Sequence, residues 1–194
     1  MSLRLLILGV SLLAALTSRT PADEVIREGD YAGARAETYK TVGDVELKVY
    51  VFTPEGHRPD DHRPAIVCFF GGGWKSGQPK QFVEHCRYLA TRGMVAMTAD
   101  YRVSSRQGTH AKECVHDGKS AIRWVRKNAS RLGVDPDRIV AAGGSAGGHV
   151  AACTGILEAW EEPGESTGVS SIPNAMVLFN PALVARAPMQ VSSG

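Results

Sequence analysis

The stretch from Ile139 to Val150, IVAAGGSAGGHV, constrains the fold of this chain more than any other. It opens with the apolar run 139–142, which is typical of a strand buried on both faces of a parallel sheet. Gly143 to Gly147 then fit the pattern G-x-S-x-G, and small residues that favour a helix follow. The sequence therefore predicts a strand, a sharp turn with Ser145 at its tip, and a helix.

The glycines of this pattern have a mechanical cause. A serine at the tip of such a turn brings together the residues two positions before and after it, so a Cβ at either would clash. The turn also leaves Ser145 at a helix N-terminus, where free N–H groups and the helix dipole favour negative charge. We expect Ser145 to be a nucleophile and the Ala146 N–H to be an oxyanion donor, the alternative being an ordinary glycine-rich turn.

A second apolar run, Ala65 to Phe70, leads directly into the glycines at 71–73 and then Trp74. Three glycines let the backbone approach a substrate carbonyl and aim N–H groups at it, which together with the Ala146 N–H would form an oxyanion hole. A phosphate loop is excluded because Trp74 stands where G-x-x-x-x-G-K-[ST] requires glycine. No G-x-G-x-x-G follows a strand either, which argues against a dinucleotide site.

The remaining elements alternate between strand and helix. We expect a polar, loosely held lead-in over 23–36, a hairpin over 37–52, and a polar loop over 53–64 with solvated His57 and His62. A helix from 79 to 92, a strand at 94–101 and a loop at 103–109 follow. The last predicted elements are helices at 113–132 and 147–160 and a buried strand at 175–179. This order predicts an α/β fold, a three-layer sandwich whose mostly parallel sheet is covered on both faces. Sites in such sheets lie at the carboxyl ends of strands.

The first 22 residues have the layout of a signal peptide. Arg4 precedes the apolar run 5–16, and small or polar residues follow up to Ala22. We expect cleavage after Ala22, with Thr17 as a second position and an uncleaved anchor or buried helix as the alternative. The rest, 23–194, is predicted to be one domain of a secreted or periplasmic protein without a stable membrane span.

Charge and cysteines narrow the functional classes further. Removing the leader takes away two arginines and no acid, so the +2 net charge of the chain falls to zero. The chain has no basic field and no polybasic stretch, so we expect no nucleic-acid partner. Export would permit disulfides among the four cysteines, but Cys68 and Cys153 lie in apolar surroundings, which favours buried free thiols. The chain has no C-x-x-C spacing that would predict a zinc site, and we expect no metal or organic cofactor.

Taken together, these motifs resemble the α/β-hydrolase esterases related to hormone-sensitive lipase and to the bacterial feruloyl and acetyl esterases. The resemblance covers residues 37–182 and rests on GGGW at 71–74, DYR at 100–102, RWVRKNA at 123–129, VDPDRI at 134–139 and GGSAGGH at 143–149. It implies a secreted ester hydrolase that works through an acyl-enzyme on Ser145, with the Gly72, Gly73 and Ala146 amides as oxyanion donors. The implied substrate is a small-molecule or carbohydrate-linked ester, and residues 100–102 would support loops.

Two departures from this family stand out. Phe70 occupies the position before the glycines where the family usually has a histidine that braces the loop. No aspartate follows Ser145, and the only later histidine is His149, one helical turn on, which we expect to pack there. His110, which follows the strand at 94–101 on the correct face of the sheet, is the other candidate for a substitute base, with an exposed loop histidine as the alternative. We therefore expect an amino-terminal portion of the fold, and the alternative function is a catalytically inactive, truncated homologue or binding module that lacks the triad acid and histidine.

Overall fold

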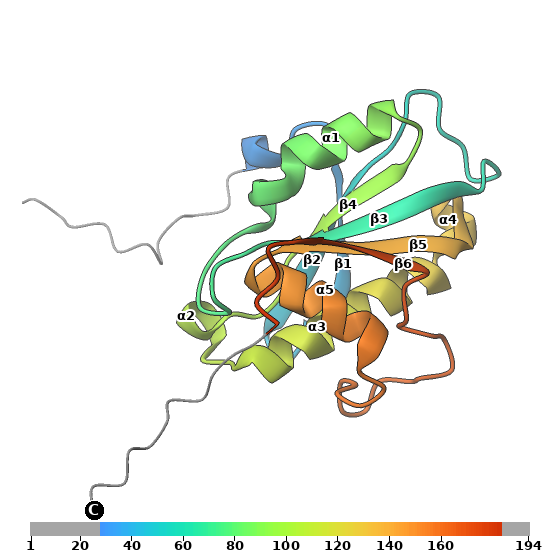
Figure 1. Ribbon diagram of the computed structural model, residues 1–194. Helices are drawn as coiled ribbons and strands as arrows, with labels where there is room; N and C mark the ends of the chain where they lie inside the picture. The colour runs from blue at the N-terminus through green and yellow to red at the C-terminus, as the bar shows by residue number, and fades with distance from the viewer. Residues whose placement is uncertain (1–27, 184–194) are drawn as a thin grey trace, which may run out of the picture.

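The computed structural model describes residues 28–183, which form one six-stranded sheet in the order β1-β2-β4-β3-β5-β6 (Figure 1). The strands are β1 (Arg35–Val42), β2 (Val45–Phe52), β3 (Arg63–Phe69), β4 (Val95–Ala99), β5 (Val134–Gly144) and β6 (Ala175–Phe179). The hairpin β1-β2 is antiparallel and joins β4 antiparallel, whereas β4, β3, β5 and β6 are mutually parallel. The signal peptide expected at 1–22 lies outside the described residues.

Helices cover both faces of this sheet. One face carries α1 (Val83–Thr91), and the other carries α3 (Ala111–Lys127) and α5 (Ala146–Ile156), as Figure 1 shows. The shorter helical turns are η2 (Glu28–Tyr31), η3 (Pro79–Phe82), α2 (Ser104–Gln107) and α4 (Ala129–Leu132). The three-layer α/β architecture with a mostly parallel sheet, predicted from the sequence, is therefore confirmed.

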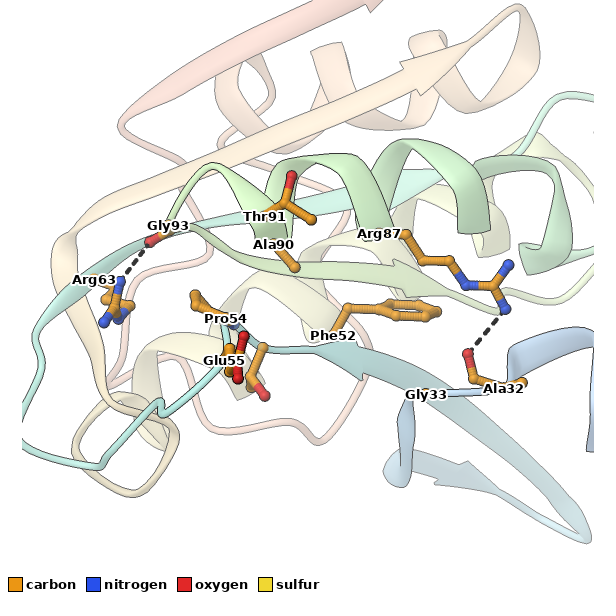
Figure 2. Close-up of a pocket in the computed structure, with 11 residues that line it drawn as sticks. Ala32, Gly33, Phe52, Pro54, Glu55, Arg63, Arg87, Ala90, Thr91 and Gly93 are labelled. Carbon is orange, nitrogen blue, oxygen red and sulfur yellow. Dashed lines mark hydrogen bonds between the residues drawn. The ribbon is translucent and has the colours of Figure 1, made fainter.

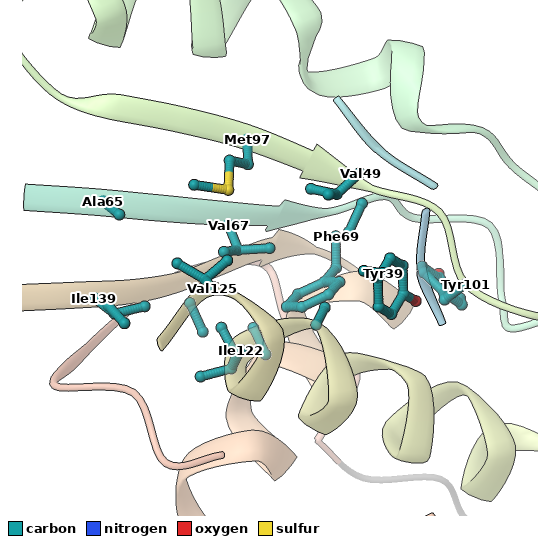
Figure 3. Close-up of a cluster of buried hydrophobic side chains, with 14 of the residues drawn as sticks. Tyr39, Val49, Ala65, Val67, Phe69, Met97, Tyr101, Ile122, Val125 and Ile139 are labelled. Carbon is teal, nitrogen blue, oxygen red and sulfur yellow. The ribbon is translucent and has the colours of Figure 1, made fainter. Parts of the chain in front are cut away.

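Strand β3 shows why the central strands read as continuous apolar runs. Val67 and Phe69 point toward α3 and α5, where they pack with Ile122 on α3 (Figure 3). Ile66 and Cys68 point to the opposite face, into the cluster that includes residues of α1. Because successive side chains of a strand alternate between faces, a strand covered by helices on both sides needs an apolar residue at every position.

The lead-in predicted as loose over 23–36 is wrong for its described part, 28–36. Tyr31 is buried and stacks on Tyr50 with ring centroids 3.6 Å apart, and β1 begins at Arg35. His57 is not a solvated residue either, because its Nε2 lies 2.9 Å from the Leu132 carbonyl oxygen. Both errors have one cause: the rings of Tyr31 and His57 lie in polar stretches but contact residues that are distant in the sequence.

Helix boundaries differ from the prediction at three places. Residues 104–107 form α2 within the predicted loop, and the predicted helix 113–132 starts at Ala111 and breaks at Asn128. The Asn128 side chain donates to the Trp124 carbonyl at 2.8 Å and so competes with the helical pattern. Helix α5 ends at Ile156 instead of 160, because the carbonyls of 157–159 turn to the buried Lys119 ammonium at 2.5, 3.4 and 3.0 Å.

The prediction that 175–179 is a buried strand is half wrong. The strand exists as β6 and pairs parallel with β5, but its Met176, Val177 and Phe179 side chains are 40%, 41% and 47% exposed. As the outermost strand, β6 has no neighbour on its outer side among the described residues. Its apolar composition is thus not matched by burial within residues 28–183.

Candidate active site

Ser145 lies at the tip of the turn between β5 and α5, as the sequence predicts. Its backbone has φ 53° and ψ −116°, a conformation that costs a non-glycine residue about 1–3 kcal/mol, and its side chain is exposed. A Cβ on Gly143 would lie 2.3 Å from the Gly147 carbonyl oxygen, and one on Gly147 would lie 2.1 Å from that of Phe69. The glycines of the pattern are therefore required by close backbone contact.

Backbone hydrogen bonds from both sides hold Ser145 in this conformation. Its N–H donates to the Phe179 carbonyl at the end of β6 at 2.9 Å. Its carbonyl accepts from the His149 N–H, the first bond of α5, and from the Ala182 N–H beyond β6, each at 3.0 Å. Ala146 begins α5, where the first amides of a helix lack intrahelical acceptors.

The glycine bend, residues 71–74, lies beside Ser145. A Cβ built on Gly71 would stand 3.4 Å from the Ser145 Cβ and 3.0 Å from the Gly144 carbonyl oxygen. The Gly71 N–H donates to Gln81 Oε1 at 2.5 Å, which fixes the start of the bend. Since the bend follows β3 and Ser145 follows β5, the carboxyl ends of two adjacent parallel strands bring them together.

The carbonyls of the glycine bend determine where its amides point. The Gly72 carbonyl accepts from the Lys75 and Ser76 amides at 3.1 and 3.0 Å, and the Gly71 carbonyl lies against Gly77. No described peptide bond is cis, so the C=O and N–H of each peptide point in opposite directions. The Gly72 and Gly73 N–H groups therefore leave the bend on the side away from residues 75–77, free of the bonds that hold the turn.

Phe70 replaces the family's bracing histidine with an apolar contact. Its ring is fully buried and stacks on Tyr101, with centroids 4.0 Å apart and planes 13° apart. The Tyr101 hydroxyl donates to the Phe70 carbonyl at 2.6 Å. The residue directly before the glycine bend is thus fixed by packing and by a backbone hydrogen bond.

A pocket of about 380 Å³ opens in front of Ser145. Its walls include Phe82 from η3, His85 from α1 and Phe179 from β6, and Gly71 lies on its floor beside Ser145. The three rings form an aromatic wall, with centroids 5.2 to 6.3 Å apart. His85 was missed by the sequence analysis, although its i, i+3 spacing from Phe82 places both rings on one side of a helical turn.

A larger pocket, of about 590 Å³, lies elsewhere on the molecule (Figure 2). It is lined by Phe52 and by Arg63 and Arg87, but both guanidinium groups already bond to backbone carbonyls, those of Gly93 and Ala32. It contains neither Ser145 nor any residue of the glycine bend. Of these two pockets the smaller is the better site, because it joins the exposed Ser145 hydroxyl to the glycine bend.

The histidines considered as a base are not placed for that role. His149 accepts from Trp74 Nε1 at its Nδ1 (3.3 Å) and lies 3.4 Å from Cys153 Sγ through its Nε2, and burial lowers its pKa. His110 is exposed and caps α3 through its backbone N–H, which donates to Glu113 at 2.8 Å. Among the described residues, no side chain hydrogen-bonds the Ser145 hydroxyl.

Asp100 and Arg102 form ion pairs that fix the loops behind the bend. Asp100 receives two hydrogen bonds from Arg106, at 2.9 and 2.7 Å. Arg102 pairs with the fully buried Asp117 on α3 at 2.8 Å, and both Glu162 and Lys40 join this cluster. None of these charged groups lines the pocket at Ser145.

All four cysteines are buried and free, as expected. The described residues contain no group of three histidine, cysteine or acidic side chains arranged to hold a metal ion. None of the helices over 28–183 has the length and apolarity that a membrane crossing needs.

Known proteins resemble this chain in sequence and in fold. The BD-FAE family model matches residues 50–176. Carboxylesterase NlhH of Mycobacterium tuberculosis is 35% identical over 111 residues (57% of this chain, 34% of the relative), and Secreted lipase 5 of Gibberella zeae is 30% identical over 189 residues (87% and 34%). Thermogutta terrifontis esterase 2, solved in a form phosphoramylated by tabun, is 54% identical with a TM-score of 0.79 (80% of this chain, 59% of that one).

The chain spans about a third of the length of these curated relatives. The propionate-bound form of Thermogutta terrifontis esterase 2 also has a TM-score of 0.79, at 53% identity, covering 84% of this chain and 60% of that one. The family model covers more than half of the chain and includes both the glycine bend and the turn at Ser145. The chain therefore belongs to the BD-FAE family of α/β-hydrolase esterases.

Proposed function

We propose that this protein is a secreted serine ester hydrolase in which Ser145 is the nucleophile and the Gly72, Gly73 and Ala146 amides form the oxyanion hole. The observation that carries the proposal is the exposed Ser145 side chain, held at a strained turn directly beside the glycine bend. A relaxed serine in an ordinary turn would need neither the positive φ nor the close backbone contacts at Gly143 and Gly147.

The chemistry is acyl transfer. The Ser145 hydroxyl attacks the ester carbonyl and loses its proton to a base. The N–H groups of the three amides donate hydrogen bonds that stabilise the negative charge on the carbonyl oxygen. Collapse of this intermediate releases the alcohol and leaves an acyl-serine, which water hydrolyses to the acid. The proposal assigns this base to no residue of 28–183, because no described imidazole bonds to the Ser145 hydroxyl.

The pocket supports short acyl groups. Its volume of about 380 Å³ is at the small end for ligand sites, and the Phe82 and Phe179 rings offer apolar contact. The solved relative is described in propionate-bound and butyrate-bound forms. We propose esters with acyl chains of a few carbons, of which acetyl esters are the first to test and feruloyl esters the bulky comparison.

The experiment uses a fluorophosphonate probe and p-nitrophenyl esters of increasing chain length. We expect the purified protein to be labelled at one residue, Ser145 by peptide mass spectrometry, and to release nitrophenol fastest from short chains. Ser145→Ala abolishes labelling, whereas Ser166→Ala, in an exposed loop, leaves it unchanged. Amino-terminal sequencing after secretion tests the predicted cleavage behind Ala22.

Two outcomes would contradict the proposal. Labelling that persists in Ser145→Ala would place the nucleophile elsewhere. A protein that unfolds cooperatively in urea, yet is neither labelled nor active, would instead favour the alternative, a catalytically inactive homologue that uses the same pocket for binding. Cooperative unfolding is therefore measured on each preparation, so that an inactive fold is distinguished from an unfolded chain.

A further inference from the structure

Trp74 is held in an unusual conformation at the end of the glycine bend. Its φ is 59°, in the left-handed region that few residues other than glycine and asparagine adopt. It follows Gly72 and Gly73, which also have positive φ. Its carbonyl accepts from the Ser104 amide at 3.0 Å, which ties its backbone to the start of α2. A bulky residue persists in such a conformation only when the structure around it holds it there.

The main polar contact of the Trp74 side chain is with His149 on α5. The indole Nε1 donates to His149 Nδ1 at 3.3 Å, and the two rings meet edge to face with centroids 5.2 Å apart. His149 lies one helical turn after Ser145, whose carbonyl accepts its backbone N–H. This contact therefore links the glycine bend, which follows β3, to the helix that carries Ser145 and Ala146.

The indole donor determines the protonation of His149. An indole N–H can only donate, so Nδ1 must be the accepting nitrogen and the ring proton must be on Nε2. That proton points to Cys153 Sγ, 3.4 Å away, which can accept it weakly. A second proton on Nδ1 would face the indole N–H and break the contact, so only the neutral ring can make it.

We propose that His149 is a positioning residue: by accepting the Trp74 indole N–H it holds the glycine bend in register with α5, so that amides from both segments face one point beside Ser145. The proposal rests on the proposed function, since an oxyanion hole built from two segments requires their fixed relative placement. The proposal gives His149 no direct part in the reaction, because its side chain neither bonds the Ser145 hydroxyl nor lines the pocket at Ser145.

The surroundings of His149 make its protonation informative. Burial lowers its pKa from 6.5. Of the described groups, Cys153 faces the ring from α5, and its own pKa is raised by burial and opposed only by the charge of Lys119 on α3. No charged group of the bend or of α3 acts on the imidazole itself. The contact is thus complete above pH 6.5 and is lost as the pH falls through the lowered pKa.

The first test measures the contact without any activity. In a ¹H–¹⁵N spectrum of the full chain, the Trp74 indole signal is assigned by its loss in Trp74→Phe. We expect His149→Phe to shift this signal and to speed its exchange with solvent by at least tenfold. In His149→Asn the amide oxygen occupies the place of Nδ1, so the signal stays protected. An unchanged Trp74 signal in His149→Phe would overturn the proposal.

The second test measures fluorophosphonate labelling of Ser145. We expect labelling to slow about 10- to 100-fold in His149→Phe, because small misplacements of a preorganised site cost this much, and to stay within about threefold in His149→Asn. Below pH 6.5 the wild type loses labelling more steeply than His149→Asn, which cannot titrate. The matched control is His62→Asn, an exposed histidine with φ 49° at which asparagine is tolerated.

The outcomes separate the inference from the function on which it rests. Trp74→Phe combined with His149→Phe should label no more slowly than either alone, because both remove one interaction. If His149→Phe does not unfold cooperatively, the labelling rates of Trp74→Phe, which loses the contact, and His149→Asn, which keeps it, are compared instead. Labelling unchanged in variants that lose the Trp74 contact overturns the proposal. A wild type with a protected Trp74 signal but no labelling overturns the proposed function and confirms the contact alone.

Discussion

Gly147→Ala is the sharpest test of how the turn at Ser145 is packed. The added Cβ would lie 2.1 Å from the Phe69 carbonyl oxygen and 2.3 Å from that of Phe70, whereas real Cβ contacts are longer than 3.0 Å. Helix α5 and the end of β3 must then separate by about 1 Å. Both contacts are with backbone, so no side-chain rotation relieves them.

The magnitude follows from two opposing effects. Overpacking of a close contact costs about 1–3 kcal/mol, and a clash with two carbonyl oxygens belongs at the upper end of that range. Alanine gains at most about 1 kcal/mol over glycine in a helix. The net loss is about 2 kcal/mol, which at a urea dependence of about 2 kcal/mol per molar lowers the unfolding midpoint by about 1 M.

Equilibrium urea unfolding monitored by circular dichroism measures this shift. The matched control is Gly168→Ala, whose added Cβ would meet only Ser166 Oγ at 3.7 Å, so its free energy of unfolding should change by less than about 0.5 kcal/mol. Equal midpoints for the two variants would refute the reasoning. So would a stable Gly147→Ala protein with undiminished Ser145 labelling, because the displaced bend should also slow the chemistry.

Further predictions concern the buried charges and thiols. Asp117→Asn removes the fully buried partner of Lys40 and Arg102 and should cost about 3–5 kcal/mol in urea unfolding, with a smaller change indicating that water reaches the cluster. Burial raises the pKa of Glu162, but the hydrogen bond from Lys40 and the nearby charges outweigh it and the pKa is lowered. Its stabilisation is therefore complete above pH 4.5 and lost as the pH falls through the lowered pKa, measurable as an acid decline of the urea midpoint that Glu162→Gln flattens. Burial raises the pKa of Cys153, so a disulfide-exchange reagent should react with the thiols only after denaturation, and rapid reaction of the native protein would contradict their burial.

The sequence predicted the turn at Ser145 well because local rules determine it. The apolar run before it, the two glycines around it and the small residues after it each have a short-range physical cause, and the structure contains all three. The glycine bend at 71–74 was located for the same reason. Its position beside Ser145 followed from parallel strand topology, which brings the carboxyl ends of β3 and β5 to one edge.

Long-range partners explain what the sequence did not show. In the stretch 157–171, three of the four acidic residues, Glu161, Glu162 and Glu165, pair with cations on β1, α3 and the loop after β4. The pocket role of His85 depends on how α1 is oriented toward β6, which spacing within α1 alone does not determine. The exposure of β6 was mispredicted because an apolar sequence is the same whether or not a neighbouring strand covers it.

The strain at Ser145 connects these two groups of observations. A positive φ at a serine costs about 1–3 kcal/mol, and each backbone hydrogen bond that holds it contributes about 1 kcal/mol. Two of the three bonds come from Phe179 and Ala182, at the end of β6 and just beyond it. The chain reaches β6 through residues 157–171, which the buried cations of α3 fix in place. The strained turn is therefore encoded locally by glycine, but it is also held by backbone bonds from the end of β6 and just beyond it, which the local pattern does not reveal.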